Sequence, residues 1–444
     1  MRENEEMLQA RDLNQQGSML LKAGNIQAAK EKFEKAMELE PMLMESYRNC
    51  GELFMLTGEY QEAKNYYKKA LLIEKDGEVY FKYGNACFMN DEPHEGLEYY
   101  NRALSAGFDS DEMLFFMGMA CEHMNDDRMA LRYIQKAINK NPSRPDYKVK
   151  KISVLLRLGL LEDAKAAAEE LILNDPELYD GYHMKTAILN EEKNFEEAVK
   201  FSKMASEKFP EDADLFYDYA QSLALWGKYD EVLAVSARAK KLRYYENAKQ
   251  RFLLLEAEIE AEKGHIDTAI DRCLECVDFE TESSADLKDS ARFLLINLYL
   301  TKPDFDSALT QAKAIIEQDR QNSYYYAAMY FRPYCLRQLG REEDAVNYYN
   351  EAISLYRLAT LTDPEAFEAY LYRTMCLKDV GRYDEALELL DFMEQLTGGE
   401  IAEVYTIRAD IYELTDKKAL AKEEMEKAYG LKPQLREILQ EIYE

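Results

Sequence analysis

One short pattern returns along the whole chain of 444 residues. In most units an alanine is followed four residues later by an aromatic or long apolar side chain, and in most units an alanine also stands seven residues after the first. The alanine column, in which glycine and valine each stand once, comprises Ala29, Ala63, Gly96, Ala130, Ala164, Ala198, Val232, Ala269, Ala308, Ala345, Ala386 and Ala421. The spacing is about 34 residues in the first seven units and longer afterwards. Such a period predicts a repeat protein, because one unit of this size cannot bury its apolar face alone.

The spacing within each unit predicts helices. Positions 0, +4 and +7 lie on one face of an α-helix. A glycine stands five residues before the alanine column in seven units, at Gly24, Gly58, Gly159, Gly227, Gly264, Gly340 and Gly381. Glycine ends a helix well because it adopts the left-handed conformation without steric cost. Each unit is therefore predicted to be a helix, a tight turn and a second helix, and the chain to be all-α.

The second unit carries the fullest version of the pattern, namely Tyr47, Cys50, Gly51, Phe54, Tyr60, Ala63, Tyr67 and Ala70. These residues and the period resemble the tetratricopeptide repeat (TPR). The resemblance covers nearly the whole chain, in twelve units that begin at residues 10, 44, 77, 111, 145, 179, 213, 250, 289, 326, 367 and 402. It implies a right-handed superhelical solenoid of stacked helical hairpins. It also implies a concave groove, lined by the first helix of each unit, that binds a protein or peptide.

The repeat spacing also predicts how the chain is divided. It has an N-terminal extension, seven tightly spaced repeats, five looser TPR-like repeats and the end of a C-terminal capping helix, at residues 1–9, 10–246, 247–435 and 436–444. A seam between about 247 and 290 is the predicted boundary at which the solenoid bends. In unit 10, Pro333 falls inside the first helix, and the second helix is expected to continue to about Thr362.

Composition restricts the classes of partner. The chain has 56 Lys+Arg against 85 Asp+Glu, a formal net charge of −29. This charge argues against nucleic acid and anionic membranes and favours basic partners. No apolar run is long enough to span a membrane, and the start of the chain has no secretory signal. Seven scattered cysteines predict free thiols in a reducing compartment, hence a cytoplasmic protein. The oligomeric state is left open.

Motifs that carry chemistry are missing from the sequence. It contains no glycine-rich phosphate loop, dinucleotide fingerprint, HExxH or GxSxG motif. Cys273 and Cys276 have zinc-like spacing, but no second ligand pair accompanies them, so core packing is favoured. His123 lacks a ligand partner at helical spacing. We therefore expect no catalytic residues, no metal and no cofactor.

On the first helix of each unit, the residues that do not pack in the core form a second stripe. This stripe would face the groove. Groove side chains in contact with water should be polar, so apolar ones there are candidates for binding. In units 2 to 4 the candidates are Arg48, Phe81, Asn85, Phe88, Met89, Phe115, Met119 and His123. The alternative is that helix packing buries these side chains.

Units 10 and 11 supply a second candidate. Arg337 and Lys378 occupy the same column in consecutive units, near Tyr330 and Tyr334. Two cations beside two tyrosines are suited to an acidic or C-terminal group. The alternative is a solvated pair of charges on an acidic protein.

The leading functional hypothesis is a scaffold or adaptor that binds a protein or peptide in the concave groove. The alternative is a structural or regulatory subunit, such as a co-chaperone or assembly factor, that engages its partner by the outer surface or a terminus. An enzyme without a recognisable motif is the third and least favoured class.

Overall fold

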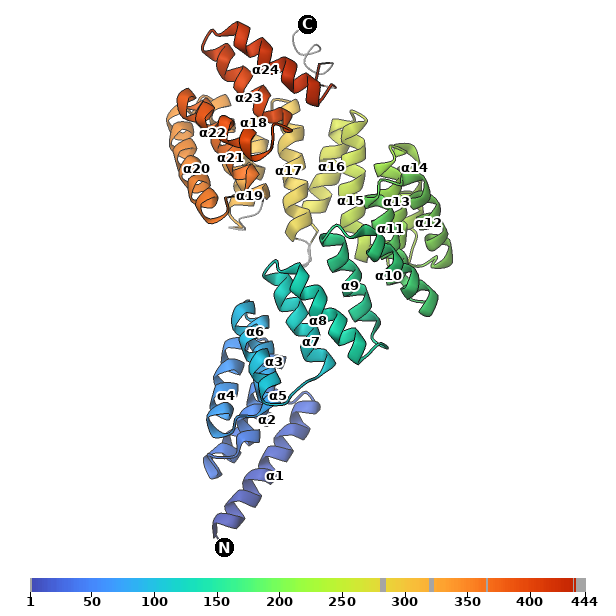
Figure 1. The fold of residues 1–444 in the computed structure, drawn as a ribbon, viewed down its shortest axis with the longest axis vertical. Helices are drawn as coiled ribbons and strands as arrows, with labels where there is room; N and C mark the ends of the chain where they lie inside the picture. The colour runs from blue at the N-terminus through green and yellow to red at the C-terminus, as the bar shows by residue number, and fades with distance from the viewer. Residues whose placement is uncertain (1, 280–284, 319–322, 365, 434, 437–444) are drawn as a thin grey trace. The chain divides into compact units, whose positions relative to one another are not determined.

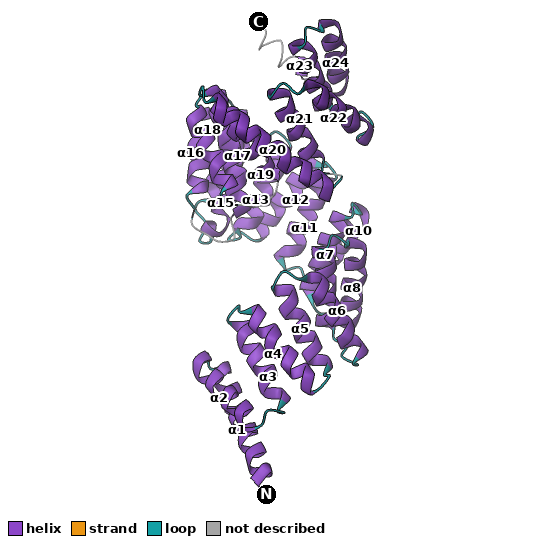
Figure 2. Cartoon of the chain, turned by 90° about the vertical axis from the view of Figure 1, so that its left-hand side faces the viewer, coloured by secondary structure: helices purple, strands orange, loops and turns teal. Residues whose placement is uncertain are grey.

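The computed structural model describes residues 2–279, 285–318, 323–364, 366–433 and 435–436. Throughout these residues the chain consists of helices and connecting loops, with no strand (Figure 2). It forms two compact units, which we describe separately. Unit 1 comprises Met1–Pro210 and Asp214–Trp226, and unit 2 comprises Glu211–Ala213 and Gly227–Glu444. Within the described ranges, no helix has both the length and the hydropathy needed to cross a bilayer.

The helices are coloured in chain order in Figure 1. Those of unit 1 are α1 (Arg2–Lys22), α2 (Ile26–Leu39), α3 (Met44–Leu56), α4 (Tyr60–Ile73), α5 (Gly77–Met89), α6 (Pro93–Ser105), α7 (Asp111–His123), α8 (Asp127–Lys140), α9 (Pro145–Arg157), α10 (Leu161–Asn174), α11 (Tyr179–Glu191), α12 (Phe195–Lys208) and α13 (Ala213–Leu225). Those of unit 2 are α14 (Tyr229–Ala239), α15 (Tyr245–Glu262), α16 (Ile266–Val277), α17 (Ala285–Thr301), α18 (Phe305–Ile316), α19 (Ser323–Gln338), α20 (Glu342–Thr362), α21 (Phe367–Asp379), α22 (Tyr383–Leu396), α23 (Ala402–Leu414) and α24 (Lys418–Leu431).

The repeat register predicted from the sequence is confirmed. The helices α3, α5, α7, α9, α11, α13, α21 and α23 begin at the residues where the repeats were placed, and α1, α15, α17 and α19 begin a few residues earlier. Odd-numbered helices are therefore the first helices of the repeats and even-numbered helices the second. Residues 2–9, predicted as an extension, belong to α1. The all-α fold of stacked helix-turn-helix repeats is confirmed.

Within each repeat the two helices are held at close range by the alanine column. Ala63 and Tyr67 of α4 are buried, and the ring of Tyr67 lies against Gly51 of α3. A Cβ atom at Gly51 would lie 2.3 Å from Cε1 of Tyr67, closer than packed atoms approach. The aromatic ring is thus accommodated because the facing residue has no side chain.

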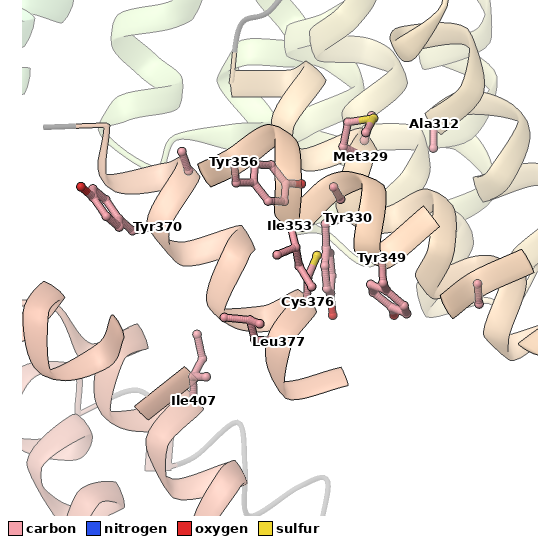
Figure 3. Close-up of a cluster of buried hydrophobic side chains, with 14 of the residues drawn as sticks. Ala312, Met329, Tyr330, Tyr349, Ile353, Tyr356, Tyr370, Cys376, Leu377 and Ile407 are labelled. Carbon is pink, nitrogen blue, oxygen red and sulfur yellow. The ribbon is translucent and has the colours of Figure 1, made fainter. Parts of the chain in front are cut away.

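The longest continuous core of unit 2 joins α17 to α23 and is rich in tyrosine. Its buried side chains include Tyr330, Tyr349, Tyr356 and Cys376, which gather between neighbouring helices (Figure 3). The helix α19 continues through Pro333, and α20 ends at Thr362 as predicted.

The division into units falls one helix earlier than the boundary expected from repeat spacing. Unit 2 begins in the main at Gly227 and so includes α14, whereas the expected boundary follows residue 246. The predicted C-terminal cap at residues 436–444 lies, apart from Arg436, outside the described residues.

Candidate protein-binding groove

The structure does not place Phe81 on a groove floor, so this part of the prediction is wrong. Phe81 of α5 is 7% exposed, and its ring lies 5.3 Å from that of Phe108 and 6.0 Å from that of Tyr100. The hydroxyl of Tyr100 donates a hydrogen bond of 2.8 Å to Oδ1 of Asn85. Both predicted residues therefore hold consecutive helices together, because aromatic residues of the facing helices close over that part of the stripe.

The other predicted residues of α5 and α7 are more accessible. Met89 is 47% exposed, and Phe88 and Met119 are half-buried. His123 is exposed, with Nε2 3.3 Å from Oδ1 of Asp91, and its ring meets that of Phe88 edge-on at 6.2 Å. These side chains cover the C-terminal turns of the two helices and remain candidates for contact with a partner.

Arg48 of α3 is partly engaged. One of its guanidinium nitrogens lies 3.9 Å from the carboxylate of Glu78, and its Nε is buried without a hydrogen-bond acceptor among the described residues. The side chain is 27% exposed, so its outer nitrogens can still donate to a polar group of a partner.

Phe115 lines a pocket of about 430 Å³ between three first helices of unit 1, α7, α9 and α11. Its ring stacks on that of Tyr147 with the centroids 4.5 Å apart, so its position is fixed. Val149 of α9 and Met184 of α11 complete the apolar part of the wall, together with Leu178 just before α11. The structure therefore places an apolar hollow around α9, one repeat further along the chain than the predicted residues of α5 and α7.

Tyr147, the support of Phe115, is itself held in place. Its hydroxyl donates a 3.1 Å hydrogen bond to Asp111, and the guanidinium of Arg144 lies 4.6 Å from its ring centroid. Burial, together with the hydrogen bond and charge of Asp111, raises the pKa of Tyr147 to about 12. The side chain is thus a neutral hydrogen-bond donor at physiological pH.

Carboxylates follow the edge of this pocket. Asp146 and Asp180 line it directly, as does Lys150, whose ammonium lies 2.7 Å from the carboxylate of Glu122. The second residue of eight consecutive first helices, α3 to α17, is acidic, and Glu112, Asp146 and Asp180 are the members of this row on α7, α9 and α11. This row was not among the predicted binding residues, although the repeat alignment places these three members in one column. Acidic residues in a first helical turn also stabilise the helix dipole, so their position has a structural reason as well.

The second predicted site contains no free pair of cations. Arg337 donates to both carboxylate oxygens of Glu342 and, at 2.7 Å, to the backbone oxygen of Asp379. Lys378 lies 2.9 Å from Oδ2 of Asp410. The expectation that these charges await an acidic group is wrong, because the chain supplies the anions itself.

The two tyrosines of that site differ in exposure. Tyr330 is 5% exposed and donates a 3.1 Å hydrogen bond to Asp379, which also accepts from Tyr349 at 2.9 Å. Tyr334 is half-buried and lies parallel to Tyr330, with the centroids 6.0 Å apart. Tyr330 therefore belongs to the core of unit 2.

Three segments of the chain match models of the tetratricopeptide repeat. One model matches residues 45–76 and 402–435, and a second matches residues 293–359. The chain carries tetratricopeptide repeats. The matched segments lie in both units and agree with the register of α3, α17 to α20, and α23.

Solved structures with a similar fold include other TPR proteins. Yeast Tom70 is 15% identical and has a TM-score of 0.47, with 97% of this chain and 99% of Tom70 covered. YrrB, described as a TPR protein with an unusual peptide-binding site, is 22% identical over 41% of this chain and 95% of its own, with a TM-score of 0.37. PilF of Pseudomonas aeruginosa is 16% identical over 50% of this chain and 99% of its own, with a TM-score of 0.40. No curated protein matches the sequence.

The TPR scaffold also brings together three residues of the types that bind metals. Ligand atoms of Cys87, Glu92 and Glu95 lie within 4.8 Å of one another. The ammonium of Lys64 already sits on both carboxylates, and burial is the main reason why the pKa of the Cys87 thiol is raised far above its usual value. A protonated thiol and a resident ammonium make this cluster an internal ion pair of the TPR core.

The Cys273-x-x-Cys276 pair lies on α16, and both side chains are buried. Burial raises the pKa of Cys273 to about 12 and that of Cys276 to about 11. Packing of this TPR helix accounts for both cysteines, as their columns suggest.

Proposed function

We propose that this TPR protein is an adaptor that binds a segment of another protein across α7, α9 and α11 of unit 1. The observation that carries the proposal is the pocket of about 430 Å³ lined by Phe115, Val149 and Met184. A hollow with apolar walls on rigid helices accepts a side chain of a partner and excludes water around it. Phe115 is fixed by its stacking on Tyr147, so little side-chain entropy is lost on binding.

The charges around the pocket favour a partner segment with basic residues. Asp180 stands at its edge, as does Asp146, both of whose oxygens accept hydrogen bonds from Arg144. Glu112 precedes them in the same column, and the whole chain carries a formal net charge of −29. An apolar side chain of the partner would enter the pocket while Lys or Arg residues on either side pair with the acidic row. Attraction between opposite charges also speeds the encounter.

A TPR scaffold presents surfaces for other proteins, and we propose that this chain has no catalytic activity of its own. We also propose a cytoplasmic location, which the seven buried free cysteines support. Cell fractionation of a tagged chain tests the location, and recovery in an oxidising compartment would contradict it.

The groove proposal is tested by changing the pocket without changing charge. Met184→Gln and Val149→Gln put an amide into the apolar wall, and Met19→Gln on the exposed face of α1 is the matched control. We expect both pocket variants to weaken the binding of arrayed peptides that combine Lys or Arg with Leu or Phe by about tenfold or more. Wild-type affinity in both pocket variants would contradict the proposal.

One observation favours the alternative of a partner bound on the outer surface. The second helices α8 and α10 leave a groove of about 700 Å³ between them, lined by Tyr133 and Lys136 on one side and Ala166 and Ala167 on the other. The two alanines open the space because they do not reach across to α8. Ala167→Leu would fill this groove, and loss of binding in that variant alone would identify the outer surface as the site.

A further inference from the structure

In unit 2, a buried arginine of one first helix is inserted between two second helices and is held there by carboxylates. Arg408 of α23 is 5% exposed. It lies 3.0 Å from Asp391 and 2.8 Å from Glu394, both of α22, and 3.0 Å from Glu424 of α24. Three acids on the flanking helices thus compensate a cation that burial alone would destabilise.

The arginine at the same repeat position in α19 is also buried and paired with a carboxylate. Arg332 is 8% exposed, and its guanidinium lies 3.1 Å from the carboxylate of Glu351 in α20. It also lies 3.8 Å from the ring centroid of Tyr348, which adds a cation–π contact. Arginine at this position is therefore a structural element when its neighbours supply the anion.

Arg373 of α21 stands at this position in the repeat between these two and lacks the anion. Among the described residues it makes no ion pair or side-chain hydrogen bond, and this sets it apart, since the Nε atoms of all three arginines are buried without an acceptor. Glu424 lies 16 residues after Arg408, and Leu389 takes that place after Arg373. Phe392 takes the place that Glu351 has in the preceding repeat. The carboxylates of the pattern are replaced by apolar residues.

Other cations lie close to Arg373, so the local charge is positive. Burial, and then the charge of Arg357 on α20, lower the pKa of Arg373, with a smaller effect from Arg382. Glu385 is the nearby acid, but both its oxygens accept hydrogen bonds of 2.6 Å from Arg382. Arg357, Arg373 and Arg382 thus all interact electrostatically with the one carboxylate of Glu385, which leaves a local surplus of positive charge.

Exposed apolar side chains lie on the two second helices next to α21, namely α20 and α22. Phe392, whose ring lies 5.2 Å from that of Tyr370, is 43% exposed. Leu396 one turn further along α22 is 43% exposed, and Leu361, one turn after Arg357 on α20, is 72% exposed. Figure 3 shows Tyr370 on the side of α21 away from Tyr349. The surface therefore combines an unpaired guanidinium with apolar neighbours.

We propose that Arg373 and Arg357 receive a carboxylate side chain of a partner protein, whose apolar neighbours pack on Phe392, Leu396 and Leu361. Charge complementarity selects an acidic and apolar segment, in contrast to the basic segment proposed for unit 1. A single carboxylate fits better than a phosphate group, because Glu385 would repel a dianion more strongly than a monoanion. Arg373 is half-buried, and its terminal guanidinium nitrogens would donate to the carboxylate.

The test uses the full chain and arrays of twelve-residue peptides that carry Glu, Gln or phosphoserine between two leucines. We expect the Glu peptides to bind at least about tenfold more tightly than their Gln counterparts, and Arg373→Met to abolish the difference. Lys200→Met is the matched control, because it removes one positive charge from the exposed face of α12. Phe392→Ser should weaken the binding of Glu and Gln peptides to the same extent.

A stability measurement separates binding from a structural role. Because Arg373 has no anion to lose, Arg373→Met should leave the unfolding midpoint unchanged or raise it, whereas Arg408→Met should lower it. If Arg373→Met unfolds the chain, Arg373 has a structural role and its variant cannot be used to measure binding. Arg357→Gln, on the exposed face of α20, then tests whether the Glu preference depends on this site.

Three results would overturn the proposal. The first is equal binding of Glu and Gln peptides, and the second is a Glu preference that survives in both Arg373→Met and Arg357→Gln. The third is tighter binding of phosphoserine peptides, which would assign the site to a phosphorylated partner. None of these results affects the groove of unit 1, because the two experiments probe different units with peptides of opposite charge.

Discussion

A single residue at the turn of each repeat adopts the left-handed conformation, and glycine fills it in seven of the repeats. Gly159 has φ of 68° and Gly58 has φ of 78°. In other repeats the same turn is made by residues with a side chain, among them Asn125 at 60° and Lys193 at 57°. Asparagine tolerates this region by local hydrogen bonding, whereas lysine does not. Of the four turns named here, the one at Lys193 is therefore the most strained.

Lys193→Gly is predicted to stabilise the protein by about 1 kcal/mol, because it removes the steric cost of the left-handed conformation. The side chain is exposed, so no packing is lost. The reciprocal change, Gly159→Ala, should destabilise it by about 1 kcal/mol, and a Cβ there would meet no atom within 4 Å, so strain alone is measured. Urea unfolding followed by circular dichroism gives both values. If Lys193→Gly leaves the free energy of unfolding unchanged, the lysine side chain must stabilise its turn in another way.

Lys64 is a buried charge that stabilises the fold through its ion pairs. Its ammonium contacts Glu92 and lies 2.9 Å from Glu95. Burial alone would raise the pKa of Glu95, but the hydrogen bonds from Lys64 and Tyr83 outweigh it and lower that pKa. A depressed carboxyl pKa stabilises the fold above the unfolded pKa, and this contribution disappears as pH falls through the folded value.

Lys64→Met should therefore cost about 2 kcal/mol at pH 7, a value reduced by the partial exposure of both acids. The difference from wild type should shrink below about pH 4, where Glu95 is protonated in the variant and then in the wild type. Unfolding free energies at pH 7, 5 and 3.5 provide the measurement. A difference that stays constant with pH would contradict the assigned role of Glu95.

At the scale of the helix pair, the close approach of two helices depends on glycine. Gly84 of α5 faces Tyr100 of α6, and a Cβ atom at residue 84 would lie 2.5 Å from Cε1 of the ring. The ring cannot move outward without breaking its hydrogen bond to Asn85. The pair is therefore matched in shape, as are Gly51 and Tyr67 in the preceding repeat.

Gly84→Ala is predicted to destabilise the protein by about 2 kcal/mol through overpacking. Gly430→Ala in α24 is the matched control, because its Cβ would meet nothing within 4 Å and alanine is the better helix former. The control should be neutral or stabilising by up to about 1 kcal/mol. Thermal unfolding monitors both. Equal effects of the two variants would mean that the α5–α6 pair repacks freely.

The repeat pattern predicts these pairs but not the surface. The alanine column and the aromatic residue four positions later set which faces of two helices meet, so the starts of α3 to α13 could be placed from the sequence. Exposure on the groove side depends on the neighbouring repeats, which the pattern of one helix does not contain. Phe81 is buried because Phe108 and Tyr100 cover it, whereas Phe115, in the same column, opens onto a pocket. The unpaired state of Arg373 likewise depends on residues of α20 and α22.

At the scale of the whole molecule, stability is distributed along the chain, because each repeat contacts mainly its neighbours. All seven cysteines are free and buried, so each reports on the repeat in which it lies. Cys121 belongs to a small buried cluster with Ala130, Ile134 and Val154. Cys335 and Cys376 share the long tyrosine-rich core of unit 2. Regions with more shared apolar burial should open at higher denaturant concentration.

We expect Cys121 to be labelled by N-ethylmaleimide at a lower urea concentration than Cys335 and Cys376, and the last two to be labelled together. In the folded protein at pH 8 all three should be protected, because burial raises the pKa of Cys335 to about 12 and shields the sulfur from the reagent. Mass spectrometry of peptides from samples pulsed across a urea series gives a midpoint for each thiol, with complete labelling in 8 M urea as the control. A single midpoint for all seven thiols would mean that the two units unfold as one cooperative body, and the fold would then transmit a binding event in one unit to the other by stability alone.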